Sequence, residues 1–204
     1  MRRAAILEAA RTALLSRPPA ELTLESLDRA AGLRQGAASM YFGSLEGLVA
    51  VLFEAELGDW LGTVEELAAK EDATRRPETL AELLADTLCD RPLLCRLLAS
   101  LPSLAARRTA EMDRLLDMEN RRLARFREAG AFLEARWPFL GPGGGAVALR
   151  RATTLATAVE PLLNPPSGLL LAMNDPELAI LHPDPREELR ELLAAALANR
   201  PGGR

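Results

Sequence analysis

The chain has 204 residues, of which 49% are apolar and 26% charged, so it can bury the core of one large or two small domains. Its formal net charge of −4 excludes a strongly basic protein that coats nucleic acid through overall charge. No apolar run is long enough to span a membrane and no secretory leader is visible, so with only two cysteines we expect a cytoplasmic protein.

The N-terminal stretch predicts an amphipathic helix from Arg2 to Ser16. Its apolar residues recur at helical spacing, and the helix must stop at the two prolines that follow Arg17. The buried stripe consists of Ile6, Leu7, Ala10, Ala13 and Leu14. Arg2 and Arg3 stand at the start of this helix, where a solvated, frayed end is one expectation.

The segment from Leu22 to Leu48 has the pattern of a helix-turn-helix. Thr23 is a suitable N-cap for a first short helix, which must end at Gly32, because a sharp corner needs the backbone freedom of glycine. A second short helix is predicted from Arg34 to Tyr41. The side chains available to face outward from it are Arg34, Gln35, Ser39 and Tyr41.

These residues resemble the tetracycline-repressor (TetR) family of bacterial transcriptional regulators. The resemblance covers about the first 55 residues, and a later run from Glu160 to Pro165 is similar to a segment of some members. The matching positions are Ile6, Leu7, Ala10, Thr23, Leu27, Ala31, Gly32, Leu33, Gly36, Tyr41, Phe42, Ser44, Glu46 and Leu48. The family implies an N-terminal DNA-binding domain and an all-helical C-terminal domain that dimerises and holds a small-molecule pocket.

The chain departs from the family pattern at several positions. Residues that usually contact phosphate are shortened or lost at Ala37, Ser39 and Leu45. Asp28 replaces a small alanine that normally packs against the recognition helix. Because an unpaired buried carboxylate is costly, we expect Asp28 to be partly exposed or paired with Arg29 or Arg34.

The remainder of the chain predicts helices throughout, giving an all-α protein of about nine helices. A long helix from Ser44 to about Lys70 has an apolar face too long for the N-terminal core alone, so it must bridge two domains. Further helices are predicted over residues 77–89, 92–100, about 104–128, 131–137, 146–163 and 185–198. Asp184, Pro185 and Glu187 mark the start of the last helix.

Three groups of C-terminal residues have two interpretations each. Trp60, Leu88, Met112 and Leu115 are either core residues or the lining of an effector pocket. The apolar residues of the last two helices form either a dimer interface, as the family implies, or part of one subunit's core; they are Ala148, Ala152, Ala156, Leu189, Leu192, Leu193 and Ala196. Cys89 and Cys95 are either small core residues or redox-sensitive thiols.

Catalytic and metal-binding patterns are missing from the sequence. His182 is the only histidine, so neither a Ser-His-Asp triad nor a multi-histidine metal site can be built from one chain. The glycines from Gly143 to Gly145 lack the lysine and hydroxyl residue of a phosphate-binding loop. We therefore expect neither an enzyme nor a cofactor, apart from an unknown small-molecule effector.

The sequence leads to one main functional hypothesis and one alternative. We predict a DNA-binding domain over residues 1–48, an effector-binding and dimerisation domain over 49–200, and a disordered tail over 201–204. The main hypothesis is a ligand-responsive repressor that binds a palindromic operator as a homodimer through Arg2, Arg3, Thr23, Arg34, Gln35, Ser39 and Tyr41. The alternative is a dimeric helical binding protein for a small apolar or amphipathic ligand whose DNA binding is weakened or lost.

Overall fold

The computed structural model describes residues 1–70, 76–106 and 112–199. The α-helices are α1 (Arg2–Ser16), α2 (Leu24–Ala30), α3 (Ala37–Phe42), α4 (Leu45–Lys70), α5 (Pro77–Cys89), α6 (Pro92–Ala106), α7 (Met112–Arg136), α8 (Gly144–Leu163), α9 (Leu170–Met173) and α10 (Pro185–Ala198). Short 3₁₀ turns are η1 (Pro19–Glu21), η2 (Pro138–Leu140), η3 (Ser167–Leu169) and η4 (Pro176–Leu181). The predicted all-α fold of about nine helices is confirmed for the described residues, and none of their helices is long and apolar enough to cross a membrane.

Most helix ends follow local chemical signals. α1 ends at Ser16 because Arg17 adopts an extended conformation before Pro18. α10 begins after Asp184, whose carboxylate accepts from the amides of Arg186 and Glu187 at 3.0 Å each. The predicted bounds of α1, α5 and α10 are therefore confirmed.

Two predicted helix breaks are wrong. α6 continues through Pro102, because a proline near the end of a helix removes one hydrogen bond without stopping the last turn. The predicted helix over 131–137 is the end of α7, which runs unbroken to Arg136. Gly130 lies within this helix and does not break it. Glycine is required at this position, because a Cβ on residue 130 would lie 2.4 Å from the amide nitrogen of Ala146 in α8.

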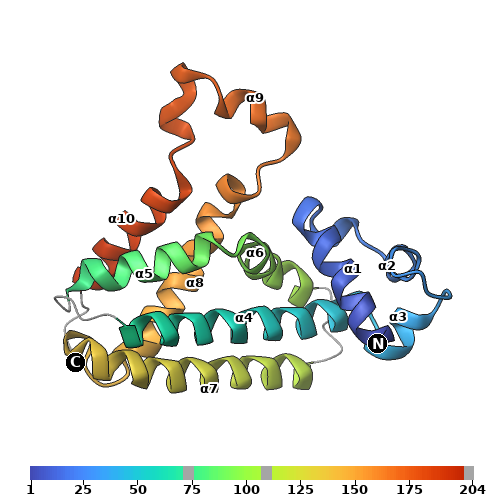
Figure 1. The fold of residues 1–204 in the computed structure, drawn as a ribbon, viewed down its shortest axis with the longest axis horizontal. Coiled ribbons are helices and arrows are strands. Elements are labelled where there is room, and N and C mark those ends of the chain that lie inside the picture. Colours follow the sequence, from blue (N-terminus) through green and yellow to red (C-terminus); the bar gives the residue numbers. More distant parts are fainter. Residues whose placement is uncertain (71–75, 107–111, 200–204) are drawn as a thin grey trace.

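Helices α1, α2 and α3, which we call the head, pack together at one end of the molecule (Figure 1). α4 runs from the head into the body, which comprises α5 to α8 and α10. The buried side chains of head and body form one continuous cluster along α4. The predicted boundary at residue 48 falls inside α4 and stays a prediction, and the predicted tail over 201–204 lies outside the described residues.

The body is held together by close helix pairs, of which α7–α8 and α5–α10 are the most extensive. α7 and α8 approach at a glycine pair: a Cβ on Gly145 would lie 2.0 Å from the carbonyl oxygen of Gly130. Only glycine fits both positions.

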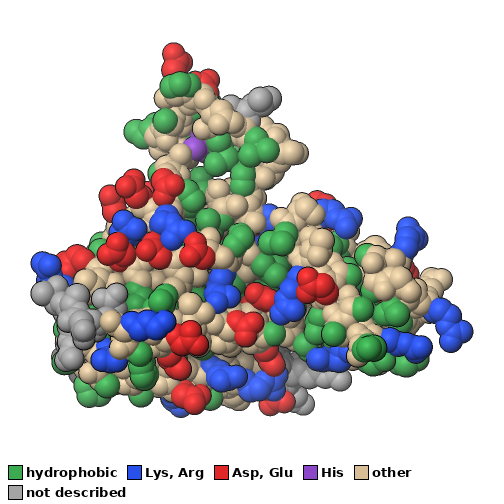
Figure 2. All heavy atoms as spheres, in the orientation of Figure 1, with side chains coloured by type: hydrophobic (Ala, Val, Ile, Leu, Met, Phe, Trp, Pro, Cys, Tyr) green, Lys and Arg blue, Asp and Glu red, His purple; other side chains and the backbone are tan. Residues whose placement is uncertain are grey.

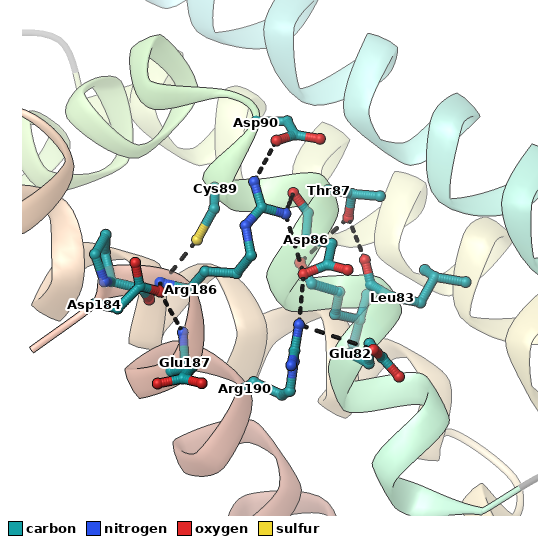
Figure 3. A network of polar contacts seen from close by, with 12 residues as sticks. Glu82, Leu83, Asp86, Thr87, Cys89, Asp90, Asp184, Arg186, Glu187 and Arg190 are labelled. Carbon is teal, nitrogen blue, oxygen red and sulfur yellow. Dashed lines mark hydrogen bonds and ion pairs between the residues drawn. The ribbon is translucent and has the colours of Figure 1, made fainter.

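Ion pairs add to the contact between α5 and α10 (Figure 3). Arg186 lies 3.1 Å from Asp86 and 2.5 Å from Asp90, and Arg190 lies 3.2 Å from Asp86. Hydrogen bonds to Asp90 and Asp86 raise the pKa of the Arg186 guanidinium. These groups are partly exposed, so each pair contributes little to stability and mainly fixes the register of α10 on α5.

Residues 164–184, which we call the arm, connect α8 to α10. The arm contains η3, α9 and η4, which contact one another, and it projects away from the body (Figure 1).

Candidate nucleic-acid interface

The turn between α2 and α3 is built by backbone hydrogen bonds around Gly32. The amide of Gly32 donates to the Arg29 carbonyl at 3.1 Å, and the amide of Leu33 donates to the Asp28 carbonyl at 2.9 Å. This is the Schellman arrangement that ends a helix, and it requires the positive φ of 66° found at Gly32. The predicted corner at Gly32 is confirmed.

The start of α2 is held by a reciprocal cap. The Thr23 hydroxyl oxygen accepts from the Ser26 amide at 3.1 Å, and the Thr23 amide donates to the Ser26 hydroxyl oxygen at 3.3 Å. Thr23 is therefore the predicted N-cap, and its side chain is exposed on the outer side of the head.

Asp28 of α2 fixes the position of α3. Its side chain is 2% exposed, and its two carboxylate oxygens accept from the backbone amides of Gly36 and Ala38 at 2.7 Å each. The carboxylate thus satisfies amides at the N-terminal end of α3, where a negative charge is favourable. The prediction of a partly exposed Asp28 or an arginine partner is wrong, because backbone amides satisfy the buried charge instead.

The outward residues fall in two groups. α3 begins at Ala37, three residues later than predicted, because Gly36 adopts a left-handed conformation with φ of 90°. Arg34 and Gln35 therefore lie in the turn before α3, whereas Ser39 and Tyr41 lie on the helix itself. All four side chains are exposed on the head.

Sequence reasoning missed Met40, which is 83% exposed at the centre of α3. A large apolar side chain with this exposure on a helix beside Ser39 and Tyr41 is available to contact a bound partner, such as the methyl group of thymine. Met40 lies within the second short helix predicted from Arg34 to Tyr41. Its position there was the only sign of a functional role in the sequence, because helical spacing alone did not show whether the side chain faces outward or inward.

The N-terminal arginines lie at the start of α1, and Arg3 lies beside the end of α3. Arg2 and Arg3 are exposed on the first turn of α1. The Arg3 guanidinium lies 5.4 Å from the centre of the Phe42 ring, a distance that allows a cation–π contact. This contact joins the start of α1 to the end of α3 and favours a defined position for Arg3 over a frayed terminus.

The outer surface of the head is weakly basic. Exposed arginines are Arg2, Arg3, Arg17, Arg29 and Arg34, and exposed acids are Glu8, Glu21 and Glu25. Arg11 does not add to this surface as a free charge, because its Nε donates to Glu56 of α4 at 2.8 Å. In Figure 2, arginine side chains project around the head, whereas acidic side chains gather over α5 and α10.

A buried arginine links the head to the body. Arg96 of α6 donates to the Leu14 carbonyl at the end of α1 at 2.7 Å, to Glu160 of α8 at 3.2 Å and to the Asn164 carbonyl at 3.4 Å. Asn164 in turn donates from its side chain to the Pro92 carbonyl at 3.1 Å. The run from Glu160 to Pro165 singled out in the sequence therefore forms part of the junction between α1, α6 and α8.

A crevice of about 910 Å³ opens beside this junction. Its walls come from the end of α1, η1, α6, the end of α8 and the root of the arm. They include Leu15, Pro19, Arg96, Ser100, Glu160 and Leu163. A molecule in the crevice would contact both the head and the body.

Trp60 and Leu88, two of the residues predicted to line an effector pocket, do not line this crevice. Trp60 and Leu88 are fully buried members of the core cluster, and the Trp60 indole N–H donates to the Thr87 hydroxyl at 3.0 Å. The side chains of Met112 and Leu115 lie outside the described residues. Within the described residues, Trp60 and Leu88 are core residues, and a pocket beside them stays a prediction.

The predicted dimer interface needs a correction. Ala148, Ala152, Ala156, Leu189 and Leu193 are buried within the chain, where α8 packs against α5, α6, α7 and α10. These five side chains cannot also face a second copy, so their predicted role is wrong. Small residues at helical spacing do permit close helix approach, but here the approaching helices belong to the same chain. Leu192 is exposed and Ala196 half-buried.

Both cysteines are buried free thiols. Desolvation raises the pKa of Cys89 to about 11 and that of Cys95 to about 12. The Cys95 thiol donates to the Leu88 carbonyl with an S–O distance of 3.4 Å. A protonated, buried thiol is a poor nucleophile, so the structure favours core residues over redox-sensitive thiols.

Comparisons with known proteins agree with this architecture. The model of the family "Tetracyclin repressor-like, C-terminal domain" matches residues 54–198. The TetR family repressor AlkX from Dietzia sp. strain DQ12-45-1b, implicated in biodegradation of n-alkanes, has a similar structure: the TM-score is 0.52, the identity 18%, and the match covers 97% of this chain and 96% of that one.

A transcriptional regulator (TerR/AcrR family) from Aquifex aeolicus VF5 is also similar, with a TM-score of 0.50 and 20% identity over 97% of this chain and 98% of that one. At these identities the two structures establish a shared fold. No curated protein sequence matches the chain.

Proposed function

We propose, from the premise that this chain belongs to the tetracycline repressor-like (TetR) family of transcriptional regulators, that it is a ligand-responsive repressor. In this proposal, two copies bind a palindromic DNA operator through their heads. The observation that carries the proposal is the support of α3 by Asp28, which leaves Arg34, Gln35, Ser39 and Tyr41 exposed on one end of the molecule.

The residue types favour a division of roles on DNA. Arg34 and Gln35 are suited to base recognition, because a guanidinium can pair with guanine through two hydrogen bonds and a carboxamide can pair with adenine in the same way. Thr23, Ser39 and Tyr41 offer hydroxyl donors for phosphates, and Arg2 and Arg3 offer charge. In a homodimer, the two heads would contact half-sites roughly 34 Å apart.

The response to an effector is proposed to pass through the Arg96 junction. Arg96 ties the end of α1 to α6 and α8, so a molecule that separates these elements would change the orientation of the head relative to the body. A small apolar or amphipathic effector would favour a spacing of the heads that no longer fits the operator.

The weakly basic head favours the alternative of a TetR-like ligand-binding protein that has lost DNA binding. Phosphate contacts normally supply much of the affinity of a DNA-binding protein, and Ala37, Ser39 and Leu45 offer few. Selection of genomic fragments by the purified protein, followed by polarisation titrations at several salt concentrations, separates the two functions. A fragment preferred over random DNA supports the repressor; equal and weak binding to all duplexes supports the alternative.

Two arginine variants test the assigned roles on the selected operator. Arg34→Ala should relax base preference at one position by about 10- to 100-fold, because a good base contact contributes about 1–3 kcal/mol. Arg3→Ala should weaken binding to all sequences alike and reduce the salt dependence, because a phosphate contact carries no base preference. Equal effects of both variants on specific and random duplexes would contradict the assignment of Arg34.

A further inference from the structure

The arm exposes apolar side chains at its tip. Ile180 is 88% exposed and Leu181 is 65% exposed, and both belong to η4. Adjacent exposed apolar side chains on a projecting segment are typical of a surface that is covered by another molecule.

The same tip carries acidic groups. Asp175 accepts from the Glu177 amide at 2.9 Å and so caps η4. The Glu177 side chain is exposed and has no ion pair among the residues that the structure describes. η4 therefore presents an acidic residue at one end and two apolar residues at the other.

The outer side of α8 and α10 has the complementary character. A groove of about 370 Å³ lies there, lined by Arg150, Arg151, Thr154, Leu155, Ala195, Ala196 and Asn199. Arg151 donates to the Ala196 carbonyl and bridges the two helices, whereas the Arg150 side chain is exposed. The groove thus combines cationic groups with an apolar floor.

No residue of the arm lines this groove in its own chain. The groove uses the middle of α8 and the end of α10, whereas the arm leaves from the end of α8 and returns at the start of α10. Leu155, the groove residue nearest to the arm on α8, lies eight positions before Leu163, which is about 12 Å at 1.5 Å per residue. In addition, the arm points away from the body (Figure 1).

We propose that the arm of one copy docks into the groove of a second copy, with Ile180 and Leu181 on Leu155 and the alanines of α10, and Glu177 beside Arg150. The contact rests on the homodimer of the proposed function and forms twice around a twofold axis. Opposite charges and matching apolar surfaces favour this occupant over an unrelated partner.

Charge reversal in the full-length chain tests the contact. The dimer dissociation constant is measured by analytical ultracentrifugation over a concentration series for Glu177→Arg, for Arg150→Glu and for the double variant. Each single variant should raise the dissociation constant about 5- to 30-fold, because two exposed ion pairs are lost and replaced by repulsion. The double variant should return to within about 3-fold of the wild type.

A matched control changes the same charge elsewhere. Glu66→Arg alters an exposed residue of α4 and should leave the dissociation constant within about 2-fold of the wild type. The apolar part is tested by Ile180→Ser with Leu181→Ser, which should weaken the dimer at least 10-fold, because burial of both side chains is lost. Circular dichroism confirms that each variant is folded.

The outcomes separate this inference from the proposed homodimer. A wild-type chain that stays monomeric at all concentrations overturns both. A wild-type dimer whose arm and groove variants dissociate no more readily than Glu66→Arg overturns the arm contact and leaves the homodimer in place. A double variant as weak as the single ones overturns the pairing of Glu177 with Arg150.

A second measurement needs no destabilising variant. A benzoylphenylalanine photo-crosslinker at position 180 should join the arm to peptides of a second chain that contain residues 150–155 or 195–199. Crosslinks confined to the same chain, or to other surfaces of the second chain, would contradict the docking site.

Discussion

The position of α3 depends on one buried carboxylate, and Asp28→Asn tests this dependence. An asparagine side chain has one oxygen acceptor, so its amide group would face the second backbone N–H, donor against donor. Hydrogen bonds to a charged group contribute about 1.5–3 kcal/mol each, and a charge at a helix N-terminus adds about 0.3–1 kcal/mol. Loss of one such bond and of the charge gives an expected destabilisation of about 2–4 kcal/mol.

The assay is urea unfolding followed by circular dichroism, with Glu25→Gln as the control. Glu25 is an exposed acid of the same helix, so its neutralisation should change the free energy of unfolding by less than about 0.5 kcal/mol. The midpoint should fall for Asp28→Asn with little change in slope. A change as small as that of Glu25→Gln would show that the amides of Gly36 and Ala38 do not need the carboxylate.

Three further variants or treatments probe other parts of the molecule. Gly145→Ala should lower stability by about 1–3 kcal/mol in urea unfolding, because its Cβ would lie 2.0 Å from the Gly130 carbonyl oxygen; unchanged stability would contradict the tight approach of α7 and α8. Arg96→Met should lower stability on the order of 3 kcal/mol, because Glu160 loses its buried partner, and adding Glu160→Gln should restore part of the loss. With pKa values raised to about 11 for Cys89 and about 12 for Cys95, both thiols should stay protonated and react slowly with Ellman's reagent at pH 8 in the native protein, and rapidly in urea; rapid reaction without urea would contradict their burial. The folded state keeps these protons more strongly than the unfolded state, so their contribution to stability is complete below about pH 9 and is lost as pH rises toward 12.

The parts of the fold that sequence predicts well are those with local causes. α10 begins after Asp184 because the carboxylate of Asp184 accepts from amides two and three residues further along the chain. α1 ends at Ser16 because Arg17 and two prolines follow it. The start of α3 was predicted three residues early, because the backbone conformation of Gly36 depends on how α3 meets α2. Helical spacing shows which residues share a face but leaves open when a left-handed residue interrupts the helix.

The parts that sequence predicts poorly depend on which elements meet. The carboxylate of Asp28 accepts hydrogen bonds from amides eight and ten residues further along the chain. These amides come within reach only because α3 folds back against α2. The stripe of Ala148, Ala152 and Ala156 indicates a close helix neighbour without identifying the chain from which it comes. Arg96 carries no local motif, and its three partners are separated from it by more than sixty residues.

The support of α3 from behind has a consequence for how such a protein diversifies. The groups that hold the short helix are Asp28, backbone amides and the glycine at position 32, whereas Arg34, Gln35 and Ser39 point outward and take no part in this support. Substitutions at the outward positions should therefore leave folding almost unchanged. Under the proposed function, new operator preferences are expected to arise at these three positions on an unaltered scaffold.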